Sequence, residues 1–164
     1  MKYYVKQKVF TLKDKFTIKD FDQNDVYQVQ GKFMSISNKL QLLRLDGTEI
    51  LNSKKKLFRL FPFYEVFTPK GDLRATIQKK LAIKPKFDVV MGNEELKVEG
   101  SFFAHSFGIL KDGRTIASIE KKLFSFGDSY EIDIEDESQL DLLLFIVIII
   151  DQVIHESEKK SNNL

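Results

Sequence analysis

The chain of 164 residues contains no cysteine and only two histidines. The absence of cysteine excludes a disulfide framework, a thiolate metal site and a cysteine nucleophile. Two histidines alone do not make a zinc site, and no carboxylates stand at a spacing that would complete one. The eight glycines are dispersed singly, which leaves no glycine-rich phosphate-binding loop. The sequence therefore predicts no catalytic residue, no metal ion and no cofactor, and a protein that is not an enzyme.

The remaining titratable candidates have simpler structural explanations. His105, in the segment FFAHSF, is expected at a strand end or turn. His155 is expected near the end of a helix, where the helix dipole favours a cation. The acidic run from Asp133 to Glu137 lacks the glycine and the ligand spacing of an EF-hand loop. We interpret this run as the acidic approach to a helix rather than as a calcium site.

The sequence also lacks a recognisable export signal and a long apolar segment. Its first residues, MKYYVKQKVF, alternate charged and apolar side chains, whereas a signal peptide needs an apolar core of about 7 to 15 residues. The longest apolar run, Leu142 to Ile150, has nine residues between Asp141 and Asp151. As a helix it would be about 14 Å long, against about 30 Å of hydrocarbon in a bilayer. We expect no transmembrane segment and a cytoplasmic protein.

The same run predicts a buried helix. Ser138, followed three residues later by Asp141, has the form of a helix N-cap, and the acidic residues 135–137 suit the positive end of a helix dipole. These signals predict a helix from Ser138 to about Ser157. Because Leu142 to Ile150 are apolar on every side, this helix cannot lie on a surface and must be enclosed.

The preceding residues are typical of β-strands almost throughout. Hairpin turns are predicted at Asp46-Gly47, Gly71, Gly92-Asn93 and Asp112-Gly113, where glycine accepts a positive φ. The β-prone segments amount to about twelve strands if Pro62 kinks one long strand, and closure into a barrel would remove the exposed edges of so large a sheet. These segments are 3–10, 15–21, 26–34, 40–45, 48–53, 57–61, 63–68, 73–83, 86–91, 95–103, 107–111, 115–124 and 129–134.

Several motifs give the chain a family resemblance. Gly71 to Lys80 and Gly113 to Lys122 share a glycine followed by Ala-x-Ile-x-Lys-Lys, so each is expected to be the outgoing strand of a hairpin that ends or bulges at its lysine pair. With the segment Val98 to Phe102, the strand Asp128-x-Tyr130-x-Ile132 and the apolar helix up to Ile154, these motifs resemble the LURP-one-related proteins, in particular their bacterial YxjI-like branch.

The resemblance covers essentially the whole chain. It implies a mainly β, Tubby C-terminal-like fold, also similar to phospholipid scramblases, in which a closed barrel of about twelve strands surrounds a central hydrophobic helix near the C-terminus. We expect one such domain over residues 1–157 and a polar tail over 158–164. Because the helix would fill the barrel, no lipocalin-like internal ligand pocket is expected.

Charge is distributed unevenly along the sequence. Residues 126–164 hold ten acids and two bases, so residues 1–125 carry 24 bases against 14 acids. Such an excess can present a positive surface to anionic partners, although solvated strand and turn lysines are the simpler explanation. The candidate anionic-ligand residues are the densest basic clusters, Lys54, Lys55, Lys56 and Arg59 followed by Lys79, Lys80, Lys84 and Lys86.

Aromatic residues interleave with the first basic cluster, a composition that could stack single-stranded nucleic acid. Packing around the helix is the simpler explanation for most of them, so no nucleic acid partner is expected. The aromatics concerned are Phe58, Phe61, Phe63, Tyr64 and Phe67.

The function predicted from these observations is a non-enzymatic, LURP-one-related cytoplasmic protein that binds anionic phospholipid headgroups, or a membrane-associated partner, at the membrane periphery. The resemblance implies it, because Tubby domains bind phosphoinositide headgroups through basic residues, but no motif transfers those residues one by one. The alternative is a protein–protein interaction scaffold without a lipid role, which an exposed apolar patch would favour. Scramblase-like activity is disfavoured, because Asp141 and Asp151 make insertion of the helix costly.

Overall fold

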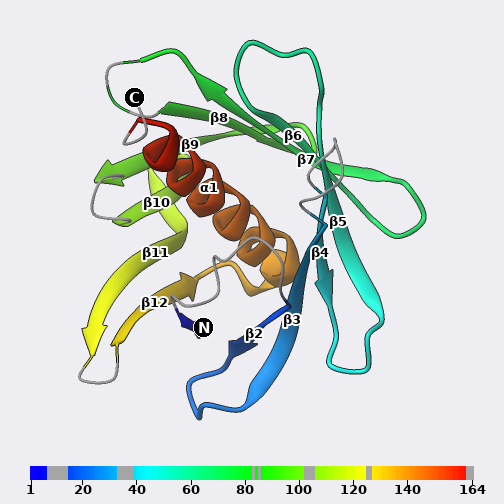
Figure 1. Ribbon diagram of the computed structural model, residues 1–164, viewed down its shortest axis with the longest axis vertical. Coiled ribbons are helices and arrows are strands. Elements are labelled where there is room, and N and C mark those ends of the chain that lie inside the picture. Colours follow the sequence, from blue (N-terminus) through cyan, green and yellow to red (C-terminus); the bar gives the residue numbers. More distant parts are fainter. Residues whose placement is uncertain are drawn as a thin grey trace.

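Twelve antiparallel strands close into one barrel around a long helix in the part of the chain that the computed structural model describes (Figure 1). That part comprises residues 1–6, 15–32, 39–82, 84, 86–101, 106–124 and 127–161. Each strand pairs with its neighbours in sequence, and β1 closes the barrel against β12. The strands are β1 Lys2–Lys6, β2 Phe16–Lys19, β3 Asp25–Lys32, β4 Lys39–Leu43, β5 Glu49–Lys55, β6 Phe63–Phe67, β7 Leu73–Lys80, β8 Lys86–Met91, β9 Glu94–Ser101, β10 Ser106–Lys111, β11 Arg114–Phe124 and β12 Gly127–Ile134.

The predicted enclosed helix is confirmed. Helix α1 (Leu140–Ser161) lies inside the barrel, and every side chain from Leu142 to Ile150 is at most 3 % exposed. Twelve strands enclose more space than their own inward side chains can fill, and the helix occupies that space. Alternate strand residues complete the core, such as Tyr64 and Val66 of β6 and Ala75 and Ile77 of β7.

The ends of the helix differ from the prediction. A 3₁₀ turn, η3 (Glu137–Gln139), precedes α1, and its N-cap is Asp136 rather than Ser138. The Asp136 carboxylate accepts hydrogen bonds from both the backbone N–H and the hydroxyl of Ser138, so Ser138 already belongs to the turn. At the other end the helix continues to Ser161, beyond the predicted end at about Ser157.

One predicted strand is absent. Residues 57–61 form the turn between β5 and β6, because the Lys56 N–H donates to the Phe63 carbonyl (2.8 Å) and closes the hairpin there. Pro62 therefore precedes a new strand instead of kinking a long one. The expected strand end at the lysine pair is confirmed in β7, whereas β11 continues through its pair to Phe124.

Polar contacts fix the helix along the barrel axis. Near its start, the Tyr27 hydroxyl of β3 donates to Asp141 Oδ1 (2.8 Å), and burial together with this bond raises the pKa of Tyr27. Near its end, Lys55 of β5 pairs with Glu156 (3.7 Å), and Lys79 of β7 donates to the Ser157 hydroxyl (2.6 Å). The helix therefore runs from the barrel end where odd-numbered strands begin to the end where they finish.

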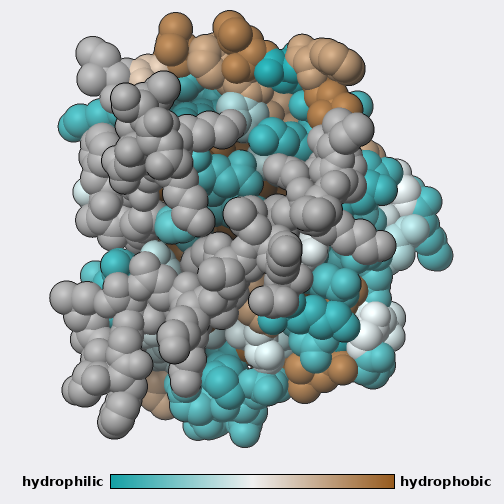
Figure 2. All heavy atoms as spheres, viewed as in Figure 1, coloured by the Kyte–Doolittle hydropathy of each residue, from teal (hydrophilic) through white to brown (hydrophobic). Residues whose placement is uncertain are grey.

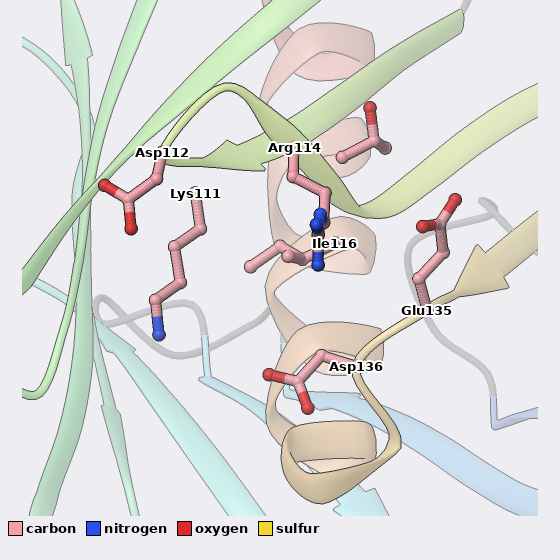
Figure 3. A pocket seen from close by; sticks show the side chains of 7 residues that line it. Lys111, Asp112, Arg114, Ile116, Glu135 and Asp136 are labelled. Atoms are coloured by element: carbon pink, nitrogen blue, oxygen red, sulfur yellow. The ribbon is translucent and has the colours of Figure 1, made fainter.

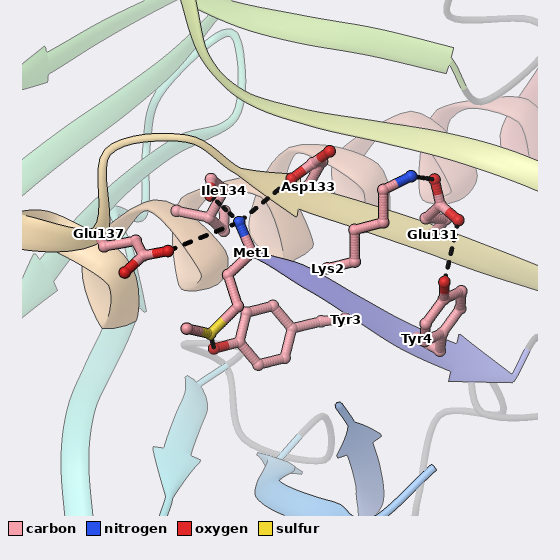
Figure 4. A network of polar contacts seen from close by, with 8 residues as sticks. All are labelled: Met1, Lys2, Tyr3, Tyr4, Glu131, Asp133, Ile134 and Glu137. Carbon is pink, nitrogen blue, oxygen red and sulfur yellow. Dashed lines mark hydrogen bonds and ion pairs between the residues drawn. The ribbon is translucent and has the colours of Figure 1, made fainter. Parts of the chain in front are cut away.

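The closing seam between β1 and β12 is reinforced by side chains (Figure 4). Lys2 Nζ pairs with Glu131 Oε1 (2.7 Å), and the Tyr4 hydroxyl donates to Glu131 Oε2 (3.1 Å). The hydrogen bond from Lys2 lowers the pKa of Glu131, and the bond from Tyr4 lowers it further. The Met1 amino group contacts Asp133 (3.4 Å) on the same strand.

Replacing Ile148 with Asp is expected to abolish folding, because this side chain is 3 % exposed inside the barrel and the new charge would be buried without a counter-ion. Circular dichroism and denaturant unfolding measure the effect. Ile148→Val, which removes one methylene, is the control and should cost about 0.5–1.5 kcal/mol. An aspartate variant that unfolds cooperatively with near wild-type stability would contradict the enclosed helix.

Glu131→Gln is expected to lower the free energy of unfolding by about 1 kcal/mol near neutral pH, a modest loss because solvent screens the half-exposed Lys2. The folded-state pKa of Glu131 lies below its unfolded value, so its stabilisation is complete above that unfolded value and is lost as the pH falls through the folded pKa. Urea unfolding from neutral to acid pH should show the two proteins converging. Glu99→Gln, which changes an exposed side chain of β9, should show no such loss.

Candidate functional site

The two predicted basic clusters lie at the same end of the barrel. Strand β5 ends at Lys55 and β7 ends at Lys80, and both adjoin β6, which starts at Phe63. The Lys79 N–H donates to the Pro62 carbonyl (2.9 Å), which places the end of β7 directly against the β5–β6 turn. We call this group the basic rim, and it consists of Lys54, Lys55, Lys56, Arg59, Lys79, Lys80, Lys84 and Lys86.

Four members of the basic rim are held by neighbouring side chains. Lys55 and Lys79 contact the helix, as described above, and are partly buried. Lys56 pairs with Glu65 (3.1 Å), and Lys80 pairs with Asp88 (2.7 Å). The charges of Lys55, Lys56 and Lys80 are therefore partly neutralised within the protein.

The other four have no carboxylate within ion-pair distance among the described residues. Lys54 Nζ lies over the Phe67 ring, 5.1 Å from its centroid, and the Arg59 guanidinium lies over the Phe63 ring at 5.0 Å. Lys84 and Lys86 are exposed beside the β7–β8 connection. Lys54, Arg59, Lys84 and Lys86 are thus the cations most available to an anionic ligand.

Exposed apolar side chains stand among these cations. Phe58 is fully exposed, Leu60 is 89 % exposed and Leu81 is 82 % exposed, and Leu57 is also open to solvent. Figure 2 shows hydrophobic residues gathered at the upper edge, where Figure 1 draws the β5–β6 and β7–β8 connections. The sequence-based assignment of the aromatics to the core was wrong for most of them, because only Tyr64 of the five is fully buried. Pro62, a turn residue next to the basic run, is the signal that could have placed Phe58 outside the sheet.

A polar layer lies beneath the basic rim. Tyr64 is 2 % exposed, and burial raises the pKa of its hydroxyl, with a further contribution from the charge of Glu156. Asp151 was expected to bound the apolar run, yet it is 1 % exposed and lies inside the barrel. His155 is half-buried on the next turn of α1, before the helix end, whereas His105 lies outside the described residues.

The opposite end of the barrel is acidic. Acids outnumber bases there because Asp20 and Asp22 lie in the β2–β3 turn, Glu94 and Glu95 follow the β8–β9 turn, and the acidic residues 135–137 lead into the helix. The turns that carry Asp46, Asp72 and Asp112 also carry basic residues. The charge asymmetry therefore follows the barrel axis as well as the sequence. An anionic surface would attract the basic end and repel this one.

A pocket of about 580 Å³ opens at this acidic end, between the β10–β11 hairpin and the start of η3 (Figure 3). Two of the residues that line it have structural roles, because Asp136 caps η3 and Lys111 pairs with Glu94 (2.7 Å). Within the described ranges no group of three or more His, Asp or Glu side chains could hold a metal ion. The residues that line the pocket are Lys111, Asp112, Arg114, Thr115, Ile116, Glu135 and Asp136.

By length and composition alone, one described helical stretch, Glu137–Ser157, could cross a membrane. Of the residues in its most apolar window, 67 % are buried, as expected for a core helix. The fold is thus that of a closed antiparallel barrel built around an apolar helix, with a basic and an acidic end.

Comparisons with known proteins agree with this class. The family model described as LURP-one-related matches residues 1–151. The uncharacterized protein YxjI of Bacillus subtilis is 32 % identical over 160 residues, 96 % of each chain. LURP-one-related protein 15 of Arabidopsis thaliana is 23 % identical over 92 % of this chain and 78 % of its own length. The chain belongs to the LURP-one-related family.

A solved structure shows the same fold. The X-ray structure of an Arabidopsis thaliana protein superposes with a TM-score of 0.63 at 19 % identity, over 92 % of this chain and 89 % of that one. The names of these similar proteins state no enzymatic activity.

Proposed function

We propose that this LURP-one-related protein is a non-enzymatic peripheral membrane protein of the cytoplasm, which binds anionic phospholipid headgroups through the basic rim. The observation that carries the proposal is the gathering of Lys54, Arg59, Lys84 and Lys86 at one end of the barrel, with no carboxylate partner among the described residues. Each lysine or arginine near an anionic membrane contributes about 1 kcal/mol of attraction.

The charge distribution along the barrel supports one orientation. The basic rim would face the membrane, and the acidic residues of the β2–β3 turn, the β8–β9 turn and the segment 135–137 would face away. Repulsion of the acidic end disfavours the inverted orientation. Arg59 can contact a phosphate group with two parallel hydrogen bonds, whereas the lysines act as point charges.

The proposed binding leaves the barrel intact. A scramblase-like role for α1 in the bilayer would require the helix to leave the barrel, although its residues Leu142 to Ile150 form the centre of the core. It would also carry Asp151 into the hydrocarbon, which is costly. The buried helix therefore supports headgroup binding rather than scrambling.

A protein–protein scaffold is the second candidate, because Phe58, Leu60 and Leu81 form the exposed apolar surface that such a role requires. These side chains stand on protruding turns among cations. That arrangement suits an anionic lipid surface better than it suits the flat apolar core of a protein interface, from which charged residues are depleted.

Co-sedimentation with phosphatidylserine, phosphoinositide and neutral phosphatidylcholine vesicles tests the proposal. We expect binding to the anionic vesicles alone, weaker at physiological than at low salt because ions screen the rim charges. The quadruple variant Lys54→Gln, Arg59→Gln, Lys84→Gln and Lys86→Gln should bind at least tenfold more weakly at low salt, since each cation contributes about 1 kcal/mol.

The matched control removes the same charge from elsewhere on the barrel, with Arg44→Gln, Lys70→Gln, Lys97→Gln and Arg114→Gln, all exposed residues. This variant should bind like the wild type. Equal loss in both variants would show attraction to net charge without a defined site. Absence of binding to any vesicle would overturn the lipid role and favour the scaffold.

A further inference from the structure

The β5–β6 turn carries apolar side chains that the core does not need. Phe58 and Leu60 lie outside the closed sheet and are exposed. The turn that carries them is closed at its base by a hydrogen bond from the Lys56 N–H to the Phe63 carbonyl (2.8 Å). Phe58 has a φ of +59°, which is uncommon for a bulky residue. Because its ring is fully exposed to solvent, Phe58 does not stabilise the barrel by packing. Residues with such a strained backbone conformation cluster at functional surfaces.

The β7–β8 connection repeats the arrangement beside it. Leu81 follows directly after Lys79 and Lys80, and the Lys79 N–H to Pro62 carbonyl bond (2.9 Å) joins the two turns at their base. We call Phe58, Leu60 and Leu81 the apolar tips. Phe58 and Leu60 follow the end of β5 at Lys55, and Leu81 follows the end of β7 at Lys80, so the tips lie beyond strand ends that carry lysines of the basic rim. Figure 1 draws both connections at the same end of the barrel.

This order of side chains matches the layers of a membrane interface. Aromatic and aliphatic side chains are stable at the boundary between headgroups and acyl chains, while lysine and arginine extend their charges to the phosphates. Electrostatic attraction alone would hold the protein outside the headgroup layer. The apolar tips would add burial that salt does not screen.

We infer that Phe58, Leu60 and Leu81 insert into the interfacial layer of an anionic phospholipid bilayer and anchor the protein with the C-terminal end of α1 toward the membrane. This inference rests on the proposed function and deepens it, because it names the acyl-chain boundary as a second partner of the same surface. Charge complementarity with the basic rim selects a lipid surface over a neutral apolar partner.

The chain contains no tryptophan, so Phe58→Trp places the one tryptophan of the variant at the tip, where its emission can be excited separately from that of the five tyrosines. Phe21→Trp is the matched control, since Phe21 is a 70 % exposed aromatic on the β2–β3 turn at the acidic end. Both variants are mixed with phosphatidylserine vesicles, with and without bromine atoms on the acyl chains near the headgroup. We expect a blue shift and bromine quenching of the F58W emission, and neither effect for F21W.

A triple variant, Phe58→Ser, Leu60→Ser and Leu81→Ser, gives an independent readout because it keeps every rim cation. It should bind like the wild type at low salt but at least fivefold more weakly at physiological salt. Bound F58W protein with unshifted, unquenched emission would overturn insertion while leaving headgroup binding in place. Failure of wild-type protein to bind any vesicle would overturn both. Equal quenching of F58W and F21W would overturn the inferred orientation.

Discussion

The structure depends on one constraint, the burial of a helix that is apolar on every side. Leu142 to Ile150 present hydrophobic side chains around the whole circumference, so packing against one sheet face would leave half of them in water. A closed barrel solves this problem, and in return the helix fills a lumen that twelve strands cannot fill alone. Helix and barrel are therefore each incomplete without the other.

Apolar burial has no direction along the barrel axis, so polar contacts determine where the helix stops. Tyr27 holds Asp141 near one end, while Lys55 and Lys79 hold Glu156 and Ser157 near the other. The second pair of contacts links the core to the basic rim. The surface that we propose to face the membrane is thus positioned by the same helix that organises the interior.

Antiparallel closure also decides which charges share a surface. Because neighbouring strands run in opposite directions, the ends of β5 and β7 and the starts of β6 and β8 meet at one rim. The acidic β2–β3 and β8–β9 turns and residues 135–137 meet at the other. Two lysine clusters separated by more than twenty residues become one surface in this way. An uneven charge along the chain thereby becomes a polarity along the barrel.

Periodicity and turn chemistry in the sequence determined the helix, the lysine pair at the end of β7, and twelve of the thirteen predicted strand segments closely enough to match a strand. These patterns depend on neighbours a few residues apart. Only the tertiary structure decided the rest. A phenylalanine in a β-prone run has the same local pattern whether it faces a core or solvent, and the closure of the turn between Lys56 and Phe63 left Phe58 outside. Likewise, the sequence marks Asp151 as a boundary of the apolar run, yet in the structure the barrel wall encloses this residue as well. Burial is a property of what surrounds a residue, and those surroundings come from strands distant in the sequence.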